Sequence, residues 1–269
     1  MQLILLGVRG STPAPGAEFV RYGGHTSCVA VVPDGGAVPT LVLDAGTGLR
    51  TLTARLDGEP YRGAIAVSHL HWDHVQGLPF FVAGDRPDAQ VDFYAPAQDG
   101  LSGHDLLARM MAPPIFPITP EGLQGHWTFA ALEAGTHQVQ GFGLRAAEVA
   151  HKGGRTFGYR VSEGDRSFAY LPDHIVSGGV ADSVRDLIRG VDVLLHDAQF
   201  GEPERALADA YGHSTVQDAM TLARECDVDR LVLFHHGPGR TDDALDRISD
   251  GLAESPWVSV AIQGDVLAV

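Results

Sequence analysis

The chain has 269 residues, of which 44% are hydrophobic and 20% charged, an ordinary balance for a globular protein. Its 34 acidic and 19 basic residues give a formal net charge of −15, which argues against a broad basic groove for nucleic acid but not against a small phosphate substrate at a metal site. No apolar stretch approaches the roughly 20 residues that cross a bilayer, and the apolar run Met1–Gly7 lacks the basic flank of a signal peptide. We therefore expect a cytoplasmic protein without a membrane partner, in which Cys28 and Cys226 are reduced structural thiols.

The first half of the chain alternates short apolar runs with clusters of Gly, Pro and Asp, a pattern typical of strands separated by tight turns. Strands are predicted near Leu3–Leu6, Ser27–Val32, Thr40–Leu43, Ala64–Ser68 and Val91–Tyr94. Helical periodicity occurs near Leu49–Leu56 and Leu101–Met111.

The second half repeats this theme. Strands are predicted near Gly143–Val149, Phe157–Val161, Ser167–Leu171, Val193–Leu195, Arg230–Phe234 and Val258–Ile262, and helices near Val180–Arg189, Thr215–Cys226 and Asp242–Glu254. Continuously apolar strands such as Leu231–Phe234 indicate coverage on both faces, which fits two sheets between outer helices. No linker or low-complexity segment divides the sequence, so we expect a single domain over residues 1–269.

One helix start is strongly signalled. The segment Ser214-Thr215-Val216-Gln217 has the capping-box pattern, which predicts Ser214 as N-cap and Gln217 at the third helical position. His213 then lies just outside the positive end of this helix, where an anion would be favoured.

The 13 histidines are unevenly spread, and their densest cluster is Ser68-His69-Leu70-His71-Trp72-Asp73-His74, directly after an apolar strand. In an extended segment His69, His71 and Asp73 share one side, whereas His74 requires a turned backbone. Imidazole and carboxylate groups at this density favour two neighbouring divalent ions, with zinc preferred and manganese or iron acceptable. A polar loop whose histidines only hydrogen-bond to neighbours is the alternative, and the density of the cluster disfavours it.

Other candidate ligands stand at the ends of later strands. His151 follows the strand through Glu148, Asp173 follows Ser167–Leu171, and His235 follows Arg230–Phe234. A lone histidine at a strand end is more often structural, but the shared placement of these three residues supports a common site.

The segment His69-Leu70-His71-Trp72-Asp73-His74 resembles the HxHxDH signature of the metallo-β-lactamase superfamily, and His151, Asp173 and His235 follow in the family's order. The resemblance implies an αββα sandwich of the α/β (α+β) class, with two central mixed sheets flanked by helices. It also implies one metal ion on His69, His71 and His151, a second on Asp73, His74 and His235, and Asp173 as the bridge. His236 competes for the last position, and we prefer His235 because it directly follows the strand.

The segment Gly212-His213-Ser214-Thr215, followed by a helix and by Arg230–His235, resembles the phosphodiesterase branch that includes the tRNA 3′-end endonuclease RNase Z. In that branch a histidine at this place contacts the scissile phosphate or assists the leaving group, which implies that role for His213. The segment His196-Asp197-Ala198-Gln199 resembles the branch's His-Glu-Ala-Thr segment. Asp is one methylene shorter than Glu, so the support of His213 by Asp197 stays open here, as does a purely structural role for either residue.

Three further segments resemble small bacterial members of this branch, some of which act on cyclic nucleotides or cyclic phosphates: Tyr22–Cys28, Leu43–Gly48 and Gln76–Phe81. Asp44–Gly48 is predicted to be a tight strand-to-helix turn without a ligand. For Trp72, Phe80 and Phe81 we favour core packing over a base-stacking pocket. The long Gly- and Pro-rich arm with which RNase Z grips tRNA has no counterpart in the sequence.

These observations predict a dinuclear metal-dependent phosphodiesterase for a small nucleotide, cyclic nucleotide or cyclic phosphate, with a metal-bridging hydroxide as nucleophile. Asp73 would orient the nucleophile as well as bind metal, and His213 would act on the phosphate. The alternatives are a ribonuclease of the RNase Z type, a thioester or lactone hydrolase with the same metal centre, and a non-catalytic metal-binding sensor. The resemblance is also compatible with a homodimer.

Overall fold

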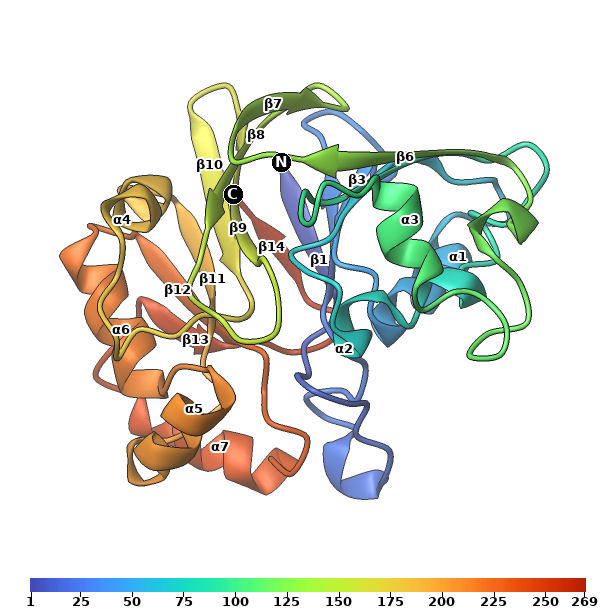
Figure 1. Cartoon of the computed structure of the whole chain (residues 1–269). Helices are drawn as coiled ribbons and strands as arrows, with labels where there is room; N and C mark the ends of the chain where they lie inside the picture. Colours follow the sequence, from blue (N-terminus) through green and yellow to red (C-terminus); the bar gives the residue numbers. More distant parts are fainter.

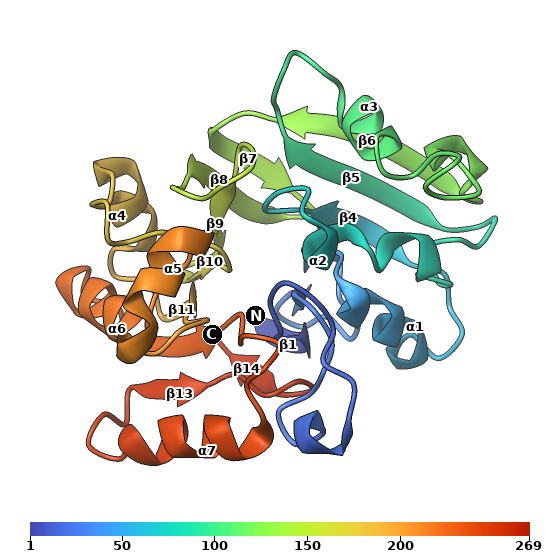
Figure 2. The same cartoon turned by 60° about the horizontal axis from the view of Figure 1, so that its bottom comes forward.

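The computed structural model describes all residues from Met1 to Val269. Two seven-stranded mixed sheets pack face to face, and each carries helices on its outer side (Figures 1 and 2). The predicted αββα sandwich is therefore confirmed.

The first sheet is built from the N-terminal half and the last strand. Its spatial order is β14 (Val266–Ala268), β1 (Gln2–Gly7), β2 (Cys28–Val32), β3 (Leu41–Leu43), β4 (Arg62–Ala66), β5 (Gln90–Pro96) and β6 (His126–Leu132). The pairs from β14 to β3 are antiparallel, and those from β3 to β6 are parallel.

The second sheet comes from the C-terminal half. Its order is β13 (Val258–Val260), β12 (Arg230–Phe234), β11 (Val193–Asp197), β10 (Arg166–Leu171), β9 (Phe157–Glu163), β8 (Phe142–Glu148) and β7 (Gly135–Val139). Strands β10 to β13 are parallel neighbours, and β7 to β10 are antiparallel neighbours.

The three-layer core follows from the alternation of side chains along each strand. In β1, Leu3 and Leu5 face the second sheet, whereas Ile4 and Leu6 face the outer helices. In β12, Val232 and Phe234 enter the central layer, whereas Leu231 and Leu233 pack against helices of the second half. A strand that is apolar at every position is thus buried on both sides, as the sequence predicts.

Short helices cover the two outer faces. The α-helices are α1 (Leu52–Arg55), α2 (Trp72–Val75), α3 (Gly103–Ala108), α4 (Asp182–Ile188), α5 (Arg205–Tyr211), α6 (Val216–Glu225) and α7 (Asp242–Gly251). The 3₁₀ helices are η1 (Ala17–Phe19), η2 (Thr47–Thr51), η3 (Leu78–Phe80), η4 (Pro120–Gly122) and η5 (Glu202–Glu204). Figure 2 shows α1 and α3 beside the first sheet and α4, α6 and α7 beside the second.

The predicted start of α6 is wrong by one residue. Thr215, not Ser214, is the N-cap: its Oγ1 atom accepts from the Asp218 amide at 3.2 Å, and Asp218 accepts from the Thr215 amide at 2.9 Å. Asp218 therefore takes the place assigned to Gln217 in the capping box. The Ser214 hydroxyl instead donates to the backbone carbonyl of His174.

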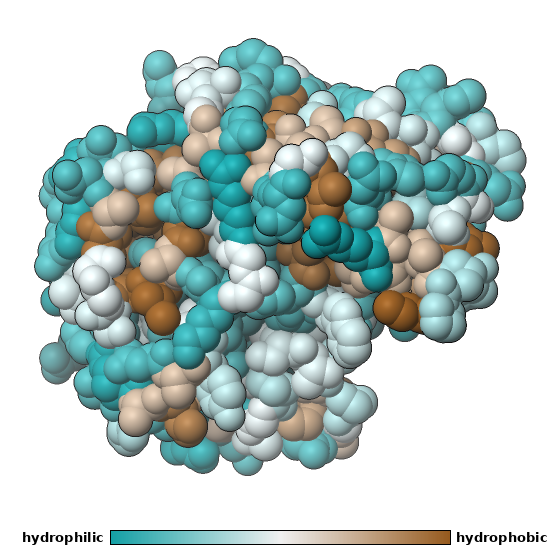
Figure 3. Space-filling view, viewed as in Figure 1, coloured by the Kyte–Doolittle hydropathy of each residue, from teal (hydrophilic) through white to brown (hydrophobic).

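The two cysteines are both buried and unpaired, as predicted. Cys28 lies between the first sheet and its helices and Cys226 between the second sheet and its helices, so the whole sandwich separates them. The face in Figure 3 is mostly hydrophilic, with hydrophobic residues in small separate patches. None of the helices combines the length and the apolar character needed to cross a membrane.

Candidate metal centre

The histidine-rich segment begins where β4 ends. The backbone of His71, the N-cap of α2, is extended, with φ of −65° and ψ of 152°. Asp73 and His74 then lie in the single turn of α2. His74 thus comes from a turned backbone as predicted, but Asp73 reaches the cluster from helical backbone and not from the extended segment.

Three imidazoles form a first group of converging nitrogens. The Nδ1 atom of His71 lies 2.8 Å from Nε2 of His69 and 3.3 Å from Nε2 of His151. His151 lies three residues after the end of β8 in the second sheet, and His71 lies five residues after the end of β4 in the first. The ligand atoms of the three residues lie close enough together to hold one metal ion.

A second group combines a carboxylate with two imidazoles. The Oδ2 atom of Asp73 lies 3.2 Å from Nε2 of His74 and 3.2 Å from Nε2 of His235. Asp73 Oδ2 also accepts a hydrogen bond from the Ser11 amide at 2.6 Å, a contact the sequence did not predict. This group too has the spacing of a metal site.

Asp173 lies between the two groups. Its Oδ1 atom is 3.7 Å from Nε2 of His151, and its Oδ2 atom is 2.8 Å from Nε2 of His74 and 3.4 Å from Nε2 of His235. One carboxylate oxygen therefore faces each group, which is the arrangement expected of a bridging ligand.

Hydrogen bonds on the far side of the imidazoles fix which nitrogen faces the centre. The Nδ1 atom of His74 lies 2.6 Å from Asp44 Oδ2, and that of His151 lies 2.7 Å from the Gly212 carbonyl. Such outer partners orient metal-binding histidines so that, when a metal ion is bound, the inner nitrogen is the one that coordinates it. Asp44 was expected to lie in a turn without a ligand. It does occupy that turn, with a left-handed φ of 60°, and its carboxylate supports His74.

The donor set fits divalent cations. The buried atoms His74 Nε2 and Asp173 Oδ2 lie 2.8 Å apart but do not have the geometry of a hydrogen bond, so neither is paired, although buried polar atoms normally are. Burial raises the pKa of Asp73, but the charges of His74 and His235 outweigh it and hold this pKa well below its usual range. Ionised carboxylates and converging imidazole nitrogens are the ligands that zinc and similar metals accept.

His213 lies beside the two groups and is held by Asp197. Its Nδ1 atom is 2.8 Å from Asp197 Oδ2, so the shorter Asp side chain does reach the histidine. Burial lowers the pKa of His213, but the carboxylates of Asp197, Asp173 and Asp73 outweigh this effect and raise the pKa to about 9.

The structure brings His235, not His236, to the cluster. The Nε2 atom of His236 lies 2.9 Å from the Ala261 carbonyl, and its ring is fully buried away from the other ligands.

A cavity of about 860 Å³ opens above the cluster. Its lining includes Asp73, His151, Asp173 and His213, and also Ser11, Trp72, Phe200, Glu204, Tyr211 and Arg240. Trp72 and Phe80 are exposed, which differs from the core packing expected for them, whereas Phe81 is buried as expected.

Comparisons with known proteins agree with this geometry. Residues 40–236 match the family described as a beta-lactamase superfamily domain. The ribonuclease Z of Nocardia farcinica is 31% identical over 220 residues, which cover 64% of this chain and 68% of the relative. Among solved structures, a diphosphatase from the PhnP family aligns over 100% of this chain and 97% of its own length, with a TM-score of 0.74 and 20% identity. Human tRNase Z, short form, aligns over 100% of this chain and 99% of its own length, with a TM-score of 0.68 and 23% identity. At these identities the two structures support the fold.

Proposed function

The chain belongs to the beta-lactamase superfamily, and on that premise we propose that it is a metal-dependent phosphodiesterase that acts on a small nucleotide or cyclic phosphate. The ribonuclease Z relatives support the reaction class. The contact between His213 and Asp197 at the wall of the cavity carries the proposal, because a cationic donor beside the metal groups suits a phosphate. An acyl hydrolase with the same metal ligands would not need this phosphate-binding histidine.

We assign His69, His71 and His151 to one metal ion and Asp73, His74 and His235 to the other, with Asp173 shared. Zinc is the first choice, and manganese or iron would accept the same ligands. When bound, two such ions supply a water nucleophile that is ionised near neutral pH and neutralise charge on the phosphoryl oxygens.

The protein's own groups would position the attacking water and protonate the leaving group. The Ser11 amide donates to Asp73 and fixes the carboxylate that would orient the attacking water. His213, with its Nδ1 proton held by Asp197, presents Nε2 to the cavity. From there it would donate a proton to the departing alkoxide or a hydrogen bond to a phosphoryl oxygen.

A small substrate is favoured over an extended RNA. The chain carries a net charge of −15, and the cavity lining contains one arginine and no lysine. Proteins that grip long nucleic acids use many cationic contacts to the backbone. A ribonuclease of the RNase Z type is the second candidate, favoured by the identity to the ribonuclease Z relatives.

The test compares metal-loaded protein, the Asp73→Ala variant and chelated protein on bis(p-nitrophenyl) phosphate, a 2′,3′-cyclic nucleotide, a precursor tRNA and an aryl thioester. We expect turnover of the first two substrates that needs metal and Asp73. Turnover of the thioester alone would refute a phosphodiesterase. Preference for the precursor tRNA over the cyclic nucleotide would favour the second candidate.

A further inference from the structure

The cavity above the metal groups contains a single permanently charged cation. Arg240 is the only arginine in the lining, which contains no lysine, and it pairs there with Glu204. The other permanently charged side chains in the lining are the carboxylates of Asp73, Asp173 and Glu204, in a chain with a net charge of −15. None of the roles assigned above uses Arg240.

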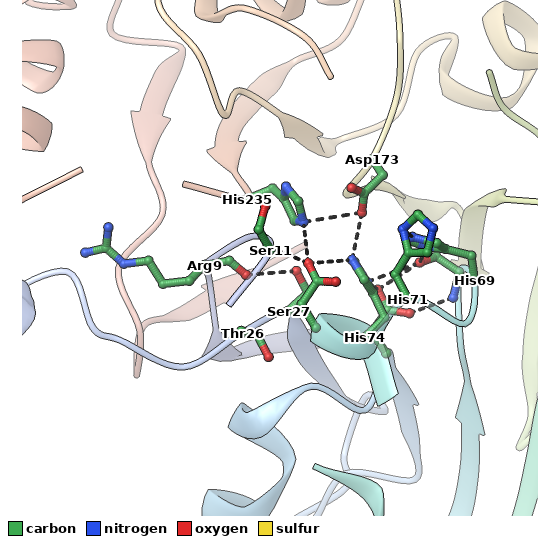
Figure 4. A network of polar contacts seen from close by, with 12 residues as sticks. Arg9, Ser11, Thr26, Ser27, His69, His71, His74, Asp173 and His235 are labelled. Carbon is green, nitrogen blue, oxygen red and sulfur yellow. Dashed lines mark hydrogen bonds and ion pairs between the residues drawn. The ribbon is translucent and has the colours of Figure 1, made fainter. Parts of the chain in front are cut away.

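The loop that carries Arg240 is held by a buried arginine. Arg9 is fully buried, and its guanidinium donates to the backbone carbonyls of Gly23, Gly237 and Arg240. Figure 4 shows its side chain extending away from the metal ligands. Burial of a guanidinium is unfavourable unless it is hydrogen-bonded. The three hydrogen bonds of Arg9 therefore restrict the position of the loop at Gly237 and Arg240.

Residues on either side of Arg9 connect this loop to the metal ligand His235. The Gly10 amide donates to the His236 carbonyl at 3.0 Å, and the His236 amide donates to the Val8 carbonyl at 2.9 Å. Since His236 follows His235, the start of the loop has a fixed position relative to the metal groups. The backbone of Arg240, whose carbonyl accepts from Arg9, is therefore fixed relative to the metal groups.

The partner of Arg240 is displaceable. The Glu204 side chain is 35% exposed and also accepts from the Gly201 amide at 2.9 Å, so it keeps a hydrogen bond when the arginine leaves. Beside this pair, the rings of Phe200 and Tyr211 stack with centroids 6.4 Å apart and line the cavity. These rings offer an apolar surface in the same cavity as Arg240 and the metal groups.

We propose that Arg240 binds a second oxyanionic group of the substrate, such as a phosphate monoester, while the scissile phosphodiester lies at the metal groups. This inference rests on the proposed function and narrows its substrate class. The planar guanidinium matches a phosphate with two parallel hydrogen bonds, and a phosphate monoester carries close to two negative charges at neutral pH. Glu204 holds Arg240 in place until the substrate displaces it.

The test measures binding and so does not depend on turnover. Calorimetry on metal-loaded protein compares adenosine 3′-monophosphate with adenosine 3′,5′-bisphosphate. We expect the bisphosphate to bind about tenfold to a hundredfold more tightly, the range for a charge-assisted hydrogen-bonded pair. Arg240→Gln should remove most of this ratio, Arg240→Lys should keep part of it, and Glu204→Gln should increase it. Arg62→Gln, an exposed arginine on β4, is the matched control and should keep the wild-type ratio.

Equal affinities for the two ligands in the wild type, absence of binding by both, or a ratio that survives Arg240→Gln would each overturn the inference. Circular dichroism of each variant identifies unfolding, and Arg240→Lys provides a second variant if Arg240→Gln fails to fold. Failure of the proposed function is a separate result, since it appears as absent turnover of bis(p-nitrophenyl) phosphate while the affinity ratio persists.

Discussion

The Oδ2 atom of Asp197 lies 2.8 Å from the Nδ1 atom of His213, and both side chains are buried. Asp197 ends β11, and its carboxylate also accepts from the backbone amides of His174 and Gln199. Three donors from three places in the chain thus fix one carboxylate. Because that carboxylate holds the Nδ1 proton of His213, the Nε2 atom is the one left for the cavity.

The first prediction concerns the proton that His213 donates. We expect His213→Gln to lower kcat by about 10²-fold or more on a 2′,3′-cyclic nucleotide, whose alkoxide must be protonated. The loss should be much smaller on bis(p-nitrophenyl) phosphate, since nitrophenolate departs without a proton. Asp197→Asn should follow the same substrate pattern, and the double variant should be no worse than His213→Gln. Equal losses on the two substrates would contradict leaving-group protonation.

A second prediction concerns the stability of metal-free protein. The pKa of His213 is raised from 6.5 to about 9, so folding favours its protonated form. This contribution to stability is complete below pH 6.5 and is lost as the pH rises through about 9. In chelated protein, the difference in unfolding free energy between wild type and His213→Gln should therefore shrink between these pH values, as urea unfolding would measure. A difference independent of pH would show that Asp197 does not favour the charged form.

The sequence predicted the candidate ligands whose positions carry a local signal. Residues His69 to His74 stand together in the chain, and His151, Asp173 and His235 each follow an apolar strand whose end could be recognised. Asp44 and Ser11 could not be assigned roles, because their contacts with His74 and Asp73 span 30 and 62 residues of sequence. Only the folded chain brings such pairs together.

The fold shows the same division. Strands with continuous apolar runs were predicted close to their true bounds, whereas β6, β7 and β14 were missed. Residues in these strands are largely half-buried or exposed. In sequence, β7 contains one apolar residue, Val139, and β14 is apolar but only three residues long, so neither resembles β1 or β12. The α6 start shows a finer limit: Ser214 and Thr215 both suit an N-cap, and the pairing of Thr215 with Asp218 decides between them.

The third prediction is that Asp173 holds both metal ions. Its two oxygens face different groups, so Asp173→Ala should lower the metal content from two ions per chain toward none. His151→Ala and His235→Ala should each lose one ion only, since each removes a ligand from one group. Metal content after dialysis, measured by mass spectrometry, separates these cases. Retention of two ions by Asp173→Ala would refute the bridging role.

The fourth prediction assigns Asp44 a role in metal affinity. Its Oδ2 atom accepts from Tyr170 at 2.8 Å and holds Nδ1 of His74 at 2.6 Å. Asp44→Asn should weaken metal binding by about 10- to 100-fold, because His74 loses the partner that orients it. Asp227→Asn is the matched control, since Asp227 also has a left-handed backbone, with φ of 53°, but is exposed and contacts no ligand. Equal metal affinities of the two variants in chelator competition would show that Asp44 does not contribute to metal binding.

The last prediction tests the packing of His235 against the N-terminal loop. A Cβ atom added at Gly10 would lie 2.3 Å from the Cε1 and Nδ1 atoms of the His235 ring, so Gly10→Ala must displace either the ring or the loop. Since we assign His235 to one of the two proposed metal ions, the variant should lose about one ion per chain and fall at least tenfold in turnover. The control is Gly178→Ala, because a Cβ there meets no atom within 4 Å. If Gly10→Ala kept both ions and full turnover while folding normally, the loop would have moved aside at no cost, and the position of His235 would not depend on it.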